Sequence, residues 1–138
     1  MIIFVVFGIP TASASPCDGI DRSLTRERKI NLAPVIARQL HAQKLHILGS
    51  FRSNNWNIIL VRTYVEEDVF LFYADDPKTN GYVTKWGGVA LDTEEQEVRD
   101  WTVKNAPGIP PPLAGCFAWA VTHFAENPEN PVWRGEGR

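Results

Sequence analysis

Two acidic segments are the first places in this chain where side chains could carry chemistry. Asp75 and Asp76 are adjacent in a segment rich in turn-forming residues, and Glu66, Glu67 and Asp68 form an acidic turn shortly before it. Paired carboxylates can act in acid–base catalysis or hold a hard cation. Neighbours on a loop need not converge on one point, however, and neither segment has the spacing of an EF-hand loop. We therefore expect solvated turns and predict neither a catalytic residue nor a metal site here.

The histidines and serines form a second candidate group. His41 and His46 are five positions apart, but a zinc site needs a third ligand and a tighter geometry. Ser50 or Ser53 could combine with His46 and Asp75 as a nucleophile triad, yet no nucleophile elbow is present. Any protein of this size offers such combinations, so we predict ordinary surface or half-buried histidines and no catalytic residues.

A pair of glycines, Gly87 and Gly88, follows an expected strand. No Lys-Ser or Lys-Thr pair comes after it, and the chain has no G-x-G-x-x-G motif, so we predict no phosphate-binding loop and no cofactor. A β-bulge that bends the strand is the simpler interpretation. The alternative is a place where another backbone approaches closely.

Cys17 and Cys116 are the chain's two cysteines. In an oxidising compartment two cysteines normally form one disulfide, and we predict that bond. The alternative makes Cys116 a nucleophile with His123 or His41 as its base. His123 lies two helical turns further on, about 10 Å along a helix axis, which is too far for direct contact.

The N-terminus predicts export. Residues 2–9 form a short apolar run, and Ala12, Ser13 and Ala14 have the small-x-small form that signal peptidase cleaves. We therefore expect residues 1–14 to be a signal peptide and the protein to be periplasmic or secreted. No positive charge precedes the apolar run, so we expect the true start to lie upstream. The run is too short to span a membrane, so no membrane insertion is expected after cleavage. The alternative is a buried N-terminal strand.

Length and charge limit the remaining possibilities. The 138 residues carry a formal net charge of −2. Nucleic acid binding and attachment to an acidic membrane surface both require a clustered positive excess, so neither is predicted. The length of the chain is that of one domain, which we place at residues 15–126. Residues 127–138 contain Pro and Gly without apolar periodicity, and we expect a frayed tail.

The remaining elements follow from apolar periodicity and turn signals. We expect a first helix that starts at Asn31 as its N-cap, accepts Pro34 in its first turn and ends near Gln43, with Arg38 and Gln39 facing solvent. Four strands follow, at residues 45–51, 56–63, 69–73 and 82–86, and their short connections indicate an antiparallel meander. A second helix is capped by Thr93 and Gln96 and ends at Asn105. A third helix runs over residues 113–124 after a proline-rich break.

Together these elements predict an α+β domain. It comprises an N-terminal helix, a four-stranded antiparallel meander and two C-terminal helices packed on one sheet face, with one disulfide. We expect the other face to be at least partly exposed, with Tyr73, Tyr82 or Trp86 on it. Exposed Tyr and Trp beside acidic loops are typical of protein–protein contact sites, although core packing is the ordinary alternative for each. The candidate contact residues are Trp56, Glu66, Glu67, Asp68, Tyr73, Asp75, Asp76, Tyr82 and Trp86.

The hypothesis from the sequence is a small exported protein-binding domain without enzymatic activity. Its favoured form is an inhibitor or immunity-type protein whose acidic loops plug a basic cleft on a protein partner of unknown identity. The alternative is a small-molecule-binding domain or minor hydrolase with an aromatic-lined pocket. A structural envelope protein is a third possibility. A filled core and a protruding acidic-aromatic surface would favour the first, and a deep cavity with converging polar groups would favour the second.

Overall fold

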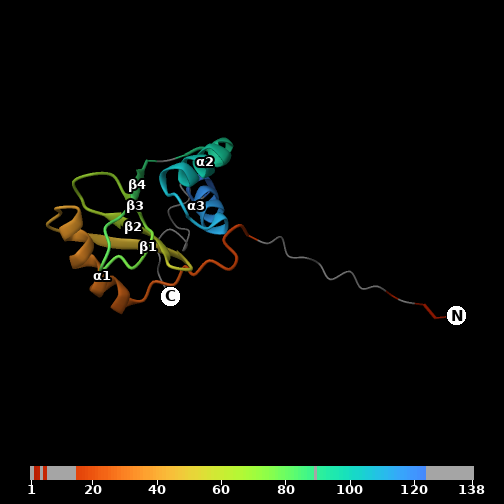
Figure 1. Ribbon diagram of the computed structural model, residues 1–138, viewed down its shortest axis with the longest axis horizontal. Helices are drawn as coiled ribbons and strands as arrows, with labels where there is room; N and C mark the ends of the chain where they lie inside the picture. The colour runs from red at the N-terminus through yellow and green to blue at the C-terminus, as the bar shows by residue number, and fades with distance from the viewer. Residues whose placement is uncertain (1, 4, 6–14, 89, 124–138) are drawn as a thin grey trace.

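A computed structural model describes residues 2–3, 5, 15–88 and 90–123 of the chain. Helix α1 (Arg26–Gln39) is followed by strands β1 (His46–Ser53), β2 (Trp56–Arg62), β3 (Val69–Tyr73) and β4 (Thr84–Gly87). A 3₁₀ turn η1 (Asp92–Glu94), helix α2 (Glu95–Asn105) and helix α3 (Pro111–His123) complete the order. This is the predicted α+β architecture (Figure 1).

The four strands form one antiparallel sheet in the order β1-β2-β3-β4, as predicted. β1 and β2 are joined by a tight hairpin in which Ser53 pairs with Trp56. The hairpin turns at Asn54, whose φ of 55° lies in the left-handed region that Asn tolerates. Each connection in such a meander reverses the chain, so successive loops fall at opposite ends of the sheet.

Helices cover both faces of the sheet (Figure 1). α2 and α3 pack on one face, where Phe51, Ile58, Phe72 and Phe117 belong to one core cluster. α1 packs on the other face. The prediction that the second sheet face is at least partly exposed is therefore wrong. All five residues of β3 are buried, because a central strand between two helical layers is apolar on both sides.

The predicted disulfide is present and links Cys17 to Cys116, 99 positions apart. Both residues are almost fully buried in the core on the α2–α3 side of the sheet. The bond ties the segment before α1 to the middle of α3, which lies on the opposite side of the sheet from α1.

The N-cap of α1 lies six residues before the expected Asn31, and the helix ends at Gln39 instead of near Gln43. Thr25 is its N-cap, and the Thr25 hydroxyl accepts a 3.1 Å hydrogen bond from the backbone N–H of Arg28. Asn31 therefore lies inside the helix, and Pro34 interrupts its interior instead of its first turn. The sequence hides this start because the first turn is polar and has no apolar period, whereas Leu32 and Ile36 supply the buried stripe.

The C-terminal helices also differ from prediction at their starts. Thr93 lies inside η1, and the free N–H of Leu91 donates to Oε1 of Glu94 at 2.9 Å, so the Thr93–Gln96 capping box does not form. α2 ends at Asn105 as predicted. α3 starts at Pro111, where the missing N–H costs no helical hydrogen bond.

The prediction of a β-bulge at Gly87-Gly88 is wrong. β4 pairs with β3 without a register shift, and the irregularity in the sheet lies in β1 between Ile47 and Gly49. Gly87 ends β4, and Gly88 turns the chain away with a φ of 101°. Most of the expected signal peptide and the whole 127–138 tail lie outside the described residues.

Candidate functional site

The two acidic segments do not come together. Glu66, Glu67 and Asp68 lie in the β2–β3 loop, whereas Asp75 and Asp76 lie in the β3–β4 loop at the other end of β3. Five strand residues separate the two loops, a distance of about 17 Å at the usual rise of an antiparallel strand. A single acidic plug built from both segments is therefore excluded.

The predicted aromatic contacts belong mostly to the core. Trp56 and Tyr73 are buried. Trp86 is half-buried and packs edge-on against Phe117 at a centroid distance of 5.7 Å. Tyr82 is half-buried and packs edge-on against Tyr73. These side chains fill the two helix–sheet interfaces and offer little surface to a partner.

The β2–β3 loop presents a different aromatic residue, Tyr64. Its side chain is 56% exposed, and the neighbouring Val65 is 82% exposed. Tyr64 has a φ of 70°, a conformation that bulky residues rarely adopt and that is often found at functional sites. Its hydroxyl contacts Nδ1 of His46 on the adjacent strand, and the Lys44 ammonium lies 5.5 Å from its ring centroid. The exposed ring is therefore held in one orientation.

A bidentate ion pair closes the base of this loop. Nε and Nη2 of Arg62 donate to the two carboxylate oxygens of Asp68 at 2.9 and 2.8 Å. The hydrogen bonds that Arg62 donates to Asp68, together with the negative charge of that carboxylate, raise the pKa of Arg62. Asp68 is thus neutralised within the loop. Glu66 and Glu67 are exposed and form no ion pair with any described residue.

At the opposite end of the sheet, Gln39 fixes the β3–β4 loop. Its amide nitrogen donates to the carbonyl oxygens of Pro77 and Asn80 at 3.0 and 3.3 Å, and its amide oxygen accepts from Tyr73. Burial raises the pKa of the Tyr73 hydroxyl. The expectation that Gln39 faces solvent is wrong. Asp75 and Asp76 are exposed on this loop.

A polar cluster lies beneath the first turns of α1. Nη2 of Arg28 donates to the side-chain oxygens of Asn57 at 2.9 Å and Ser50 at 3.5 Å. Arg52 pairs with Asp21 at 2.7 Å, and the same two residues also exchange backbone hydrogen bonds. The segment before α1 is thereby held to the edge of β1.

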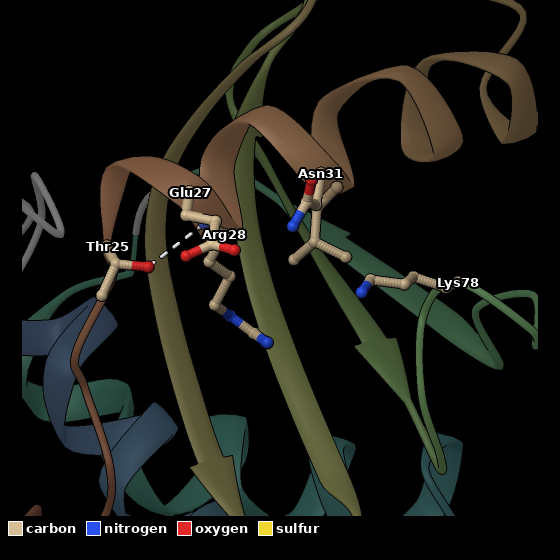
Figure 2. Close-up of a pocket in the computed structure, with 6 residues that line it drawn as sticks. Thr25, Glu27, Arg28, Asn31 and Lys78 are labelled. Atoms are coloured by element: carbon tan, nitrogen blue, oxygen red, sulfur yellow. Dashed lines mark hydrogen bonds between the residues drawn. The ribbon is translucent and has the colours of Figure 1, made fainter.

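A shallow pocket of about 210 Å³ opens beside this cluster (Figure 2). Five of its lining residues come from the start of α1 and one, Lys78, comes from the β3–β4 loop. None of the six is aromatic, so it is not the aromatic-lined pocket of the alternative hypothesis. The lining residues are Thr25, Glu27, Arg28, Asn31, Leu32 and Lys78.

The remaining candidate catalytic side chains are not assembled into a site. His46 starts β1 at the end of the sheet opposite Asp75, and Ser50 binds Arg28, so the Ser-His-Asp combination has no geometric basis. His123 stacks on Trp119 instead of approaching a thiol, because Cys116 is in the disulfide. No group of three potential metal ligands occurs among the described residues.

Comparison with protein-family models, curated proteins and solved structures found no match to this chain. Within the described ranges, no helix combines the length and apolar character that a membrane span requires. The disulfide is compatible with an oxidising, extracytoplasmic compartment.

Two kinds of residue escaped the prediction from sequence. Tyr64 and Val65 directly precede the acidic turn, and two apolar residues in a polar turn are a signal that could have identified the exposed tip. Arg28 and Lys78 are 50 positions apart in sequence and meet only because the β3–β4 loop folds against α1. No local sequence pattern indicates that these two residues line the same pocket.

Proposed function

We propose that this protein is an exported, non-enzymatic domain that blocks another protein by inserting its β2–β3 loop into a basic cleft. The observation that carries the proposal is the exposed tip formed by Tyr64 and Val65, followed directly by the uncompensated acids Glu66 and Glu67. The proposed compartment is the periplasm or the extracellular space.

The tip has the composition of a binding contact. An exposed tyrosine supplies a large contact area with little conformational entropy to lose, and tyrosine is enriched among residues that dominate binding energy. Val65 is 82% exposed, which is unfavourable for an apolar side chain in the free protein. A partner that covers Tyr64 and Val65 recovers this hydrophobic free energy.

The loop is also preorganised. The Arg62–Asp68 pair closes its base, and His46 and Lys44 hold the Tyr64 ring from the β1 side. A loop that is already ordered loses less entropy on binding, which favours affinity. The positive φ of Tyr64 is consistent with a preorganised loop, since a strained backbone conformation persists only where the surrounding structure enforces it.

Charge selects the partner. Asp68 is neutralised by Arg62, so Glu66 and Glu67 leave the tip negative. Acidic groups around an apolar contact accelerate association with a positively charged cleft and disfavour acidic partners. We therefore propose a basic protein as the target.

Export rests on three observations. The disulfide suits an oxidising compartment. The residues 12–14 cleavage pattern follows an apolar run. Ile2, Ile3 and Val5 are 83, 75 and 64% exposed and lie outside the core, in contrast to the buried N-terminal strand considered as the alternative.

Site-specific crosslinking tests the proposal. A photo-crosslinkable amino acid in place of Val65 is compared with one in place of Val103, a 54% exposed valine on α2. In the native host with the full signal, we expect the first to crosslink one extracytoplasmic protein and the second to crosslink none. Equal crosslinking from both positions, or none from position 65, would overturn the proposal.

The purified pair then tests the charge argument. E66Q/E67Q is expected to weaken binding by about tenfold or more at low salt, since each charge contributes on the order of 1 kcal/mol in a favourable contact. D75N/D76N makes the same charge change at the opposite end of the sheet and is expected to leave the Kd unchanged. Equal effects of the two double variants would contradict binding through the β2–β3 loop.

A further inference from the structure

The pocket beside α1 is lined by two cations, Arg28 and Lys78. Arg28 extends from α1 over the strands beneath it, and Lys78 reaches toward α1 from the neighbouring loop (Figure 2). Neither forms an ion pair with a carboxylate in the described part of the chain. This site is independent of the β2–β3 loop.

Arg28 is held in place by neutral partners only. Its Nη2 donates to Asn57 and Ser50, its Nε is buried without a hydrogen bond, and its Nη1 remains available as a donor. Desolvation by burial lowers the pKa of Arg28, and the positive charge of Arg52 lowers it further. A half-buried cation with neutral contacts is electrostatically costly, so an arriving anion would stabilise it.

Two of the nearby acids, Asp21 and Asp76, are engaged elsewhere. The Asp21 carboxylate accepts hydrogen bonds from Ser23 and pairs with Arg52. Oδ1 of Asp76 accepts the backbone N–H of Lys78 at 3.0 Å. Both acids act on Arg28 at a distance and raise its pKa, without reaching contact.

Lys78 is carried by a well-anchored loop. The Asp76 contact to its backbone fixes the turn, and Gln39 binds the carbonyl of the preceding Pro77. The Lys78 ammonium itself has neither a hydrogen bond nor an ion pair with the described residues. Its backbone is therefore positioned while its charge remains free.

We infer that this pocket binds the carboxylate group of a small monoanionic ligand between Arg28 and Lys78. A guanidinium and an ammonium are suited to two carboxylate oxygens. Glu27 also lines the pocket, so the lining carries two positive charges and one negative charge. That balance favours a single negative charge over a polyanion such as phosphate. The volume of about 210 Å³ suits a short organic acid or the carboxyl end of a peptide.

Titration followed by NMR of the ¹⁵N-labelled full domain, with the Arg28 side-chain Nε resonance as the direct readout, tests the inference. The probes are acetate, inorganic phosphate, N-acetyl-trialanine with a free carboxyl group, and the same peptide as its amide. We expect saturable shifts with acetate and with the free-acid peptide, and none with the amide. Tighter binding of the peptide than of acetate would assign the site to a chain terminus, and the reverse would assign it to small organic acids.

Substitutions on the exposed rim avoid disturbing the fold. K78M is expected to weaken acetate binding by about fivefold or more, whereas K104M removes an exposed lysine from α2 and should have no effect. E27Q is expected to strengthen binding by removing the negative charge. Absence of saturation, equal affinity of K78M and wild type, or tighter binding of phosphate than of acetate would each overturn the inference.

Discussion

The hydroxyl of the buried Tyr73 donates a 2.6 Å hydrogen bond to Oε1 of Gln39, which lies 34 positions earlier in the chain. The same Gln39 side chain donates to two carbonyl oxygens of the β3–β4 loop. One amide thus joins the end of α1, the end of β3 and the loop that carries Lys78.

Replacement of Gln39 is expected to destabilise the protein. Gln39→Leu removes the partner of a buried hydroxyl and leaves two loop carbonyls without their donor, at a cost of about 1–3 kcal/mol in the free energy of unfolding. Urea denaturation measures this. Arg38→Ala changes the neighbouring exposed residue and should lie within about 0.5 kcal/mol of wild type. Equal effects of the two variants would contradict the role assigned to Gln39.

The disulfide is expected to be the largest single contribution to stability outside the hydrophobic core. In the chain-entropy account, closing a loop of 99 residues contributes about 4–5 kcal/mol. Reduction, or the double variant C17S/C116S, should lower the urea midpoint and the Tm strongly. Reductant should leave the double variant unchanged. A wild-type protein with the same midpoint in oxidised and reduced forms would show that the bond contributes nothing.

Acid stability depends in part on Asp21. Hydrogen bonds from Ser23, with a smaller contribution from Arg52, lower the pKa of this carboxyl from 3.8 to about 2. Because the pKa in the folded protein is below its ordinary value, the contribution to stability is present above pH 3.8 and is lost as the pH falls toward 2. Asp21 is exposed, so solvent screening keeps the effect small.

Asp21→Asn should therefore reduce the loss of stability over that acidic interval, measured as the urea midpoint at a series of pH values. Asp92→Asn is the matched control, because the exposed Asp92 side chain forms no hydrogen bond or ion pair within the described ranges. It should keep the wild-type slope. An unchanged slope in Asp21→Asn would contradict the assignment.

The start of α1 can be tested by two substitutions. Thr25→Ala removes the hydroxyl that accepts the Arg28 N–H and should cost about 1 kcal/mol. Asn31→Ala replaces an exposed residue inside the helix with a better helix former and should leave stability equal or slightly higher. The opposite ranking of the two variants would place the helix start at Asn31. Chemical denaturation followed by circular dichroism measures both.

Much of the fold follows from local sequence. Asn54 indicates the turn of the first hairpin, and the β-branched and aromatic segments indicate the strands. The presence of two cysteines predicts the disulfide between them. The separation of the acidic loops also follows from the meander, since consecutive connections must lie at alternate ends of the sheet. The uniformly apolar β3 likewise indicates a strand covered on both faces. These two consequences could have been drawn from the sequence.

The sequence by itself determined the order of the elements, the antiparallel meander and the disulfide, because these depend on periodicity, turn residues and the pairing of two thiols. Only the tertiary structure decided that α1 covers the second sheet face, that Tyr73 is buried against Gln39, and that Arg28 and Lys78 share a pocket. Tyr73 and Gln39 are 34 positions apart, and Arg28 and Lys78 are 50 positions apart. Packing of whole helices against the sheet brings such residues together, and no local pattern encodes that packing.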